Sequence, residues 1–115
     1  MQANDLLLIR LLAYTAMRFG AHDKAQTLYA ALLALDPADL GAARGQAWAW
    51  LEAGRPREAL ARIDTLEGPD EPRPVSQLLR ARALAQLGRG EDADVAMKAF
   101  LALRARDAGA NGGRP

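Results

Sequence analysis

Side chains that could act as nucleophiles, acid–base catalysts or soft metal ligands are scarce in this sequence of 115 residues. It contains no cysteine, one histidine (His22) and one serine (Ser76). A catalytic triad, a thiolate nucleophile and a zinc site each need several such groups close together. We therefore expect no enzymatic activity, no metal and no cofactor.

Carboxylates gather at Glu91, Asp92 and Asp94. These residues fall in the first turn of a predicted helix, where acidic side chains complement the helix dipole, so we interpret them as helix-stabilising rather than metal-binding. Over the whole chain, 15 basic residues face 14 acidic ones, for a net charge of +1. This balance provides no broad positive field for nucleic acid or an anionic membrane surface, and we expect neither as a partner.

The chemistry that remains is the binding of another polypeptide, through side chains placed by a 34-residue repeat. Three glycines mark the repeat, and an alanine follows each by five residues: Gly20, Gly54 and Gly88, then Ala25, Ala59 and Ala93. Glycine can adopt the left-handed backbone conformation that closes a helix, and a small side chain lets two helices approach closely. Two helices joined by such a glycine every 34 residues are the signature of tetratricopeptide repeats.

The composition also favours helices. The chain has 26 alanines and 19 leucines but only seven β-branched residues, which disfavours strands. We predict helices at Asp5–Phe19, His22–Leu35, Asp39–Ala53, Pro56–Leu66, Pro74–Leu87 and Glu91–Arg106. The predicted fold is all-α: three tandem tetratricopeptide repeats (about 6–39, 40–73 and 74–107) forming a short superhelical solenoid in one domain, 1–107. We expect a proline-rich turn at 68–74 and a disordered tail at 108–115.

The first helix of each repeat should line the concave face of such a solenoid. In the repeat frame, the candidate partner-binding residues are Leu7, Arg10, Leu11, Tyr14, Met17, Arg18, Arg44, Trp48, Leu51, Leu78, Leu79 and Arg82. They make an apolar strip whose arginines could pair with acidic groups of a ligand, while Gly41 and Gly45 would let a partner backbone approach. The expected ligand is an extended or amphipathic helical segment lying in the groove.

The same side chains allow a second interpretation, because leucines and aromatic residues at helical spacing also form internal cores. We expect Trp48 in the groove and Trp50 in the core. The first helix is apolar around most of its circumference, so part of it could pack in a homodimer. Arg10 and Arg18 interrupt this helix, which is too short and too charged to cross a bilayer, and no export signal precedes it. We therefore expect no membrane insertion and a cytoplasmic location.

Two stretches resemble a known family. FGAHDKAQTLYAALLALDPADLGAARGQAWAWLEAG (19–54) and LLRARALAQLGRGEDADVAMKAFLAL (78–103) resemble the small Y-type chaperones of bacterial type III secretion systems, the YscY/SctY family. The resemblance implies a chaperone that binds a small X-type early export substrate in the cytoplasm and delivers it to the major export gate. Two alternatives stay open: a needle-subunit chaperone with a different client, and a tetratricopeptide scaffold that associates with itself.

Overall fold

The chain is all-α in the computed structural model, which describes residues 2–66 and 73–112. The helices are α1 (Ala3–Arg18), α2 (His22–Leu35), α3 (Leu40–Glu52), α4 (Pro56–Leu66), α5 (Pro74–Gln86) and α6 (Gly90–Gly112). These bounds lie within two residues of the predicted ones except at the end of α6. Across the two described ranges the chain forms no strand, in keeping with the predicted fold class.

The last helix is longer than the sequence predicted. α6 continues through Gly112 instead of ending near Arg106, so it overlaps the tail that we expected to be disordered at 108–115. Three alanines after Arg104 explain the extension, because alanine has the highest intrinsic helix propensity. Residues 113–115 lie outside the described part of the chain, as do residues 67–72 within the predicted proline-rich turn. After that gap, Arg73 is extended and Pro74 occupies the first turn of α5.

The same turn closes α1, α3 and α5. Gly20, Gly54 and Gly88 have φ angles of 77°, 74° and 76°, the left-handed conformation that glycine adopts without steric cost. The residue after each glycine donates its backbone N–H to the carbonyl five residues earlier: Ala21 to Ala16 (2.8 Å), Arg55 to Trp50 (2.7 Å) and Arg89 to Leu84 (2.9 Å). This is a Schellman turn, and its threefold occurrence reverses the chain in the same way after each of the three helices.

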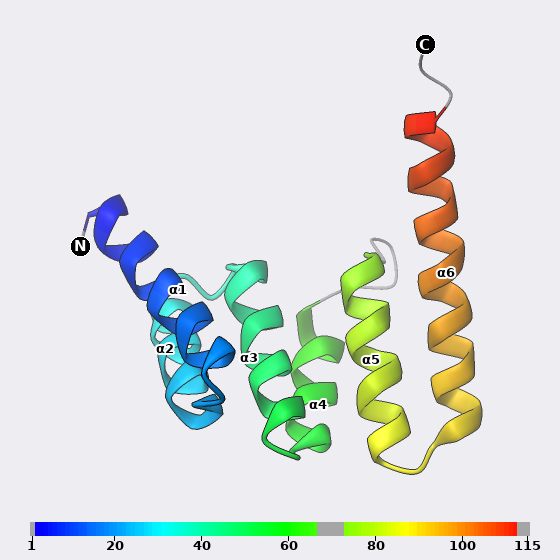
Figure 1. Cartoon of the computed structure of the whole chain (residues 1–115), viewed down its shortest axis with the longest axis horizontal. Helices are drawn as coiled ribbons and strands as arrows, with labels where there is room; N and C mark the ends of the chain where they lie inside the picture. The colour runs from blue at the N-terminus through cyan, green and yellow to red at the C-terminus, as the bar shows by residue number, and fades with distance from the viewer. Residues whose placement is uncertain (1, 67–72, 113–115) are drawn as a thin grey trace.

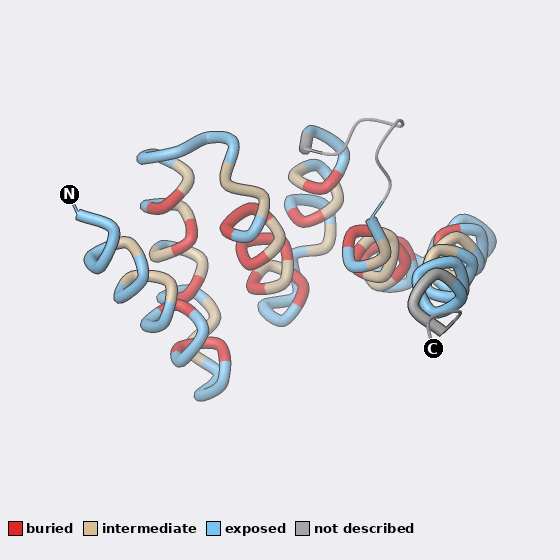
Figure 2. Tube along the Cα trace, turned by 90° about the horizontal axis from the view of Figure 1, so that it is seen from above, coloured by how far each residue is buried: buried red, intermediate tan, exposed pale blue. Residues whose placement is uncertain are grey.

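The helices form a row in chain order. Every helix packs against the next one, and α3 also contacts α1 and α5. Figure 1 shows α1 and α6 at the two ends of the row, α3 and α5 between them on the viewer's side, and α4 behind. Seen from above in Figure 2, α1, α5 and α6 again lie toward one side and α4 toward the other. The side facing the viewer of Figure 1 is therefore the inner side of a bent row.

Small residues lie where the helices touch. The alanines at 13, 47 and 81 and those at 25, 59 and 93 are all buried. Tyr29 and Ile63, one turn beyond Ala25 and Ala59, are buried as well and fill the space next to these close contacts. Three apolar clusters result, and partly buried Trp48 packs against the first two of them. The repeated small residues therefore determine the spacing of the helices.

None of the helices within 2–66 and 73–112 combines the length and the apolar character that a bilayer crossing requires.

Candidate partner-binding surface

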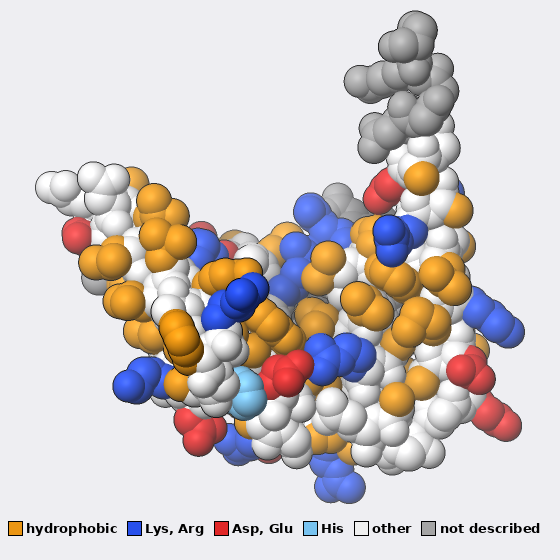
Figure 3. All heavy atoms as spheres, in the orientation of Figure 1, with side chains coloured by type: hydrophobic (Ala, Val, Ile, Leu, Met, Phe, Trp, Pro, Cys, Tyr) orange, Lys and Arg blue, Asp and Glu red, His pale blue; other side chains and the backbone are white. Residues whose placement is uncertain are grey.

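Apolar side chains remain uncovered on the inner side of the row. Figure 3 shows hydrophobic side chains gathered over α1, α3, α5 and α6, in the hollow between the two outer helices. Of the residues predicted for this surface, Leu7, Leu11 and Tyr14 of α1 are about half exposed, and Trp48 and Leu78 are partly buried. The structure therefore brings five of the predicted apolar residues to accessible positions on three helices.

An aromatic pair links the first two of these helices. The rings of Tyr14 and Trp48 are tilted by 44° with their centroids 6.5 Å apart, a separation at which aromatic rings attract each other. Trp48 also packs against two core clusters, whereas Tyr14 is about half exposed. The pair thus forms an apolar platform at the N-terminal half of the inner surface.

Three predicted partner-binding residues belong to the core instead. Met17, Leu51 and Leu79 are only 6%, 2% and 6% exposed, so a partner cannot contact them without rearranging the helices. Met17 packs in the cluster between α1, α2 and α3, whereas Leu51 and Leu79 pack in the cluster between α3, α4 and α5, so neighbouring helices cover all three. These residues belong to the core beneath the inner surface and are not part of the surface itself.

The prediction that Gly45 would admit the backbone of a partner is wrong. A Cβ atom placed on Gly45 would lie 2.4 Å from the ring of Tyr29, so the tyrosine of α2 already fills that space. Gly41 is exposed, but a Cβ atom there would lie 3.3 Å from the Arg10 guanidinium. The two glycines therefore serve contacts within the chain.

Arg10 is engaged by Asp39. Its Nη2 lies 2.6 Å from Asp39 Oδ2, and Nη1 donates a weaker bond of 3.4 Å to Oδ1. Asp39 also caps α3 by accepting from the backbone N–H of Ala42. The hydrogen bond between the two side chains lowers the pKa of Asp39 and raises the pKa of Arg10. Arg10 thus ties α1 to the start of α3.

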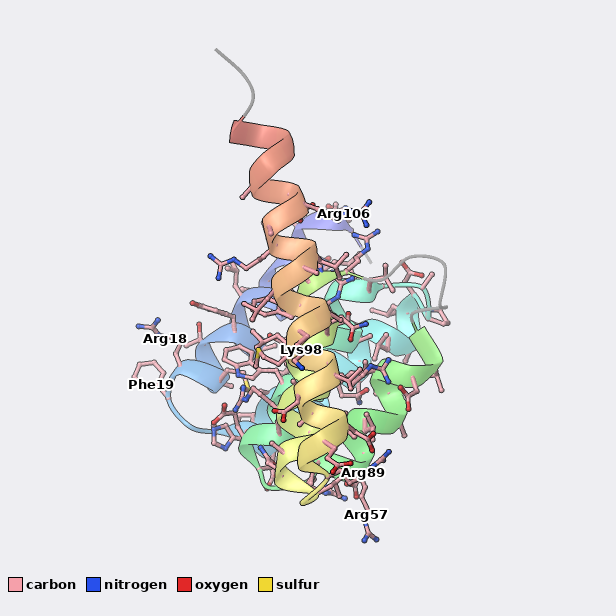
Figure 4. All side chains as sticks on the ribbon, turned by 90° about the vertical axis from the view of Figure 1, so that its right-hand side faces the viewer. Arg18, Phe19, Arg57, Arg89, Lys98 and Arg106 are labelled. Carbon is pink, nitrogen blue, oxygen red and sulfur yellow. The ribbon has the colours of Figure 1, made fainter. Side chains whose placement is uncertain are left out.

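The other predicted arginines differ in their surroundings. Arg82 Nη2 donates to Glu52 at 2.7 Å, which lowers the pKa of Glu52 and joins α5 to α3. Arg44 Nε donates to the Ser76 hydroxyl at 3.3 Å, joining α3 to α5. Arg18 is exposed, and Figure 4 shows it at the side of the molecule beside Phe19, pointing away from the helices. Of these arginines, Arg18 is the best placed to meet an acidic group of a partner.

The sequence analysis missed the contribution of α6. Met97 and Phe100 of α6 are partly buried and stand 68 residues after Tyr29 and Leu32, which are buried. No described helix follows α6 to cover them, so they stay accessible. The Arg104 guanidinium lies 5.9 Å from the centroid of the Phe100 ring. Extending the repeat frame to the second helix of the third repeat would have found both residues.

The accessible side chains of this surface are mainly apolar. Among the described residues, no three His, Asp or Glu side chains come together as a metal site would need. The surface instead offers aliphatic and aromatic groups, with arginines that hold the helices in place.

No family model matches the sequence, and no curated protein matches it either. Any function proposed for the chain therefore rests on its own residues and geometry.

Proposed function

We propose that this chain is a tetratricopeptide-repeat chaperone of the Y type that binds a small X-type export substrate of a type III secretion system. Support for the repeat assignment comes from the three Schellman turns, which are 34 residues apart and have nearly identical φ angles. The buried alanines five residues after each turn add to it. Tetratricopeptide units combine this period with this small-residue packing.

The observation that carries the binding function is the exposed inner surface around Tyr14 and Trp48. Burying a leucine or aromatic side chain stabilises a complex by about 1.5–3 kcal/mol, before the costs of association. Leu7, Leu11 and Tyr14, each about half exposed, supply a substantial part of such a gain when a partner covers them. Soluble monomers seldom leave a contiguous patch of this kind in water.

The partner that fits this surface is an amphipathic helix. The surface is a strip across parallel-lying helices, with few free polar groups at its centre, which suits an apolar helix face in a groove. A short secreted protein with such helices would be kept soluble in the cytoplasm while its apolar faces are covered. Delivery to the major export gate follows from the family resemblance alone.

The two alternatives predict different partners for the same surface. A needle-subunit chaperone would hold the needle protein, whereas a stand-alone scaffold would hold no secretion client. Co-expression of the full chain with an X-type substrate and with a needle subunit from one secretion gene set distinguishes them. We expect copurification of the X-type substrate and a complex mass with one copy of each chain. Recovery of the needle subunit alone would favour the first alternative, and recovery of neither would contradict the chaperone function.

A further inference from the structure

One side of α1 has the residues of a packed helix face but no described helix against it. The residues of α3 that lie toward α2 are Ala42, Gly45, Gln46 and Ala49, and all four are buried. The equivalent residues of α5, toward α4, are Ser76, Leu79, Arg80 and Ala83, of which three are buried and Arg80 is half-buried. The equivalents in α1 are Leu8, Leu11, Leu12 and Thr15, and all four are exposed. We call these four residues the α1 edge.

The α1 edge is apolar over its whole length. Leu8, Leu11 and Leu12 are 56%, 54% and 49% exposed, although their equivalents in α3 are fully covered. The Thr15 hydroxyl donates to the Leu11 carbonyl at 2.8 Å, so its hydrogen-bonding capacity is used within the helix. The three leucines, together with a threonine whose hydroxyl is already hydrogen-bonded, form a face whose removal from water is favourable.

A head-to-tail stack, in which α6 of a second copy covers the α1 edge, fits poorly. In the α4–α5 contact, Asp64 pairs with Arg80 and Leu60 packs into the core. The same geometry between copies would place Lys98 against Leu12 and would put Asp94 in the place of Leu60. Both charged side chains would then be moved from water into contact with leucines, and this desolvation is costly even where the two charges pair with each other.

The α1 edge of a second copy fits better. The edge itself carries no charge, so two copies bring no charged side chain into the contact. Asp5 lies near the start of α1 and Arg18 at its end. An antiparallel pair centred between Leu11 and Leu12 sets Asp5 of each copy level with Arg18 of the other, and it opposes the two helix dipoles favourably.

We infer that this chain forms a homodimer through the α1 edge, with two α1 helices antiparallel about a twofold axis near Leu11 and Leu12. The contact is isologous, so it closes after two copies. It uses Leu8 and Leu12, which lie around the helix from the Tyr14–Trp48 surface. The inference therefore does not rest on the proposed chaperone function. The dimer would cover Leu11, whereas the Tyr14–Trp48 pair of each copy stays available.

Sedimentation equilibrium of the full chain over micromolar to millimolar concentrations tests the dimer. We expect a monomer–dimer equilibrium for the natural sequence and a loss of about a hundredfold or more in dimer affinity for the double variant Leu8→Glu/Leu12→Glu. The matched control is Leu101→Glu, which changes an equally exposed leucine on α6 and should leave the dimer intact. A monomer at all concentrations, or assemblies larger than a dimer that Leu101→Glu abolishes, would overturn the inference.

Crosslinking tests the geometry independently of affinity. The chain has no cysteine, so a Leu12→Cys variant carries a unique thiol next to the proposed axis. Under mild oxidation, Leu12→Cys should form a covalent dimer, and Leu101→Cys should not. Circular dichroism confirms that each variant keeps its helices. Equal crosslinking of the two variants would mean that the contact is not the one inferred.

Discussion

The two outer helices, α1 and α6, each end the row of helices, but the side chains on their outer sides differ. Neither α1 nor α6 has a described helix on its outer side, so residues that are buried in the middle of the row become accessible at both ends. On α6 this outer side includes charged Asp94 and Lys98. On α1 it is made of leucines. The terminal units of repeat stacks commonly carry polar outer faces, and α6 has charged residues there where α1 has leucines. The uncovered apolar edge is therefore a feature of α1.

The largest expected difference between the two ends is in the loss of stability when a buried alanine is replaced by a larger residue. Ala25 of α2 is fully buried in the cluster that α2 forms with α1 and α3. Ala93 of α6 is 9% exposed at the α5–α6 contact. We expect Ala25→Leu to cost about 3 kcal/mol of unfolding free energy, enough to unfold much of a small domain, and Ala93→Leu to cost about 1 kcal/mol. Urea unfolding followed by circular dichroism measures both. Equal losses would mean that the two ends are packed alike.

Loss of client binding is the next largest expected effect. Tyr14→Asp removes the exposed ring of the aromatic platform and should weaken the binding of an X-type substrate by about a hundredfold. Trp48→Asp should abolish binding too, but it also lowers the melting temperature because Trp48 packs against two core clusters. Titration of the purified client measures the affinity. Leu35→Asp, at an equally exposed leucine of α2, is the control and should bind normally.

The glycine turns are what the two ends share, so substitutions there should have equal effects. Gly20→Ala and Gly88→Ala each force a side chain into a positive-φ conformation and should cost about 1 kcal/mol. Gly90→Ala is the matched control: it lies two residues from Gly88, at the start of α6, and an added Cβ meets nothing there. Thermal unfolding should show similar losses for the first two variants and none for the control. Unequal losses would show that the two turns contribute differently to the stability of the fold.

A small pH effect on stability should come from the Arg10–Asp39 pair in the N-terminal half. The pKa of Asp39 is lowered in the folded chain by its hydrogen bond to Arg10. The resulting stabilisation is fully present above the ordinary carboxyl pKa of the unfolded chain, 3.8, and is lost as the pH falls through the lower folded value. We expect less than about 1 kcal/mol, because Arg10 is partly exposed. Asp39→Asn should flatten this part of the stability–pH curve between neutral pH and pH 3, and an unchanged curve would contradict it.

The fold was more predictable than the surface. Helix bounds near Gly20, Gly54 and Gly88 follow from hydrogen bonds that span at most five residues, so the local sequence contains the whole signal. The end of α6 was missed because Gly109 and the residues after it are typical of tails, whereas the alanines around them extend the helix. For the surface, the repeat frame found the exposed Leu7, Leu11 and Tyr14 but also included the buried Met17, Leu51 and Leu79.

The sequence by itself determined the helices, the three reversals of the chain and the places where small residues let helices touch. All of these depend on neighbours within a turn or two, or on a period that can be read directly. The tertiary structure alone decided which side of each helix stays in water and which charges are already paired. Arg10 meets Asp39 and Arg82 meets Glu52 across 29 and 30 residues, and Tyr29 fills the space beside Gly45. Such contacts depend on how one helix is rotated against the next, and a rotation of one residue, about 100°, turns a surface position into a core position.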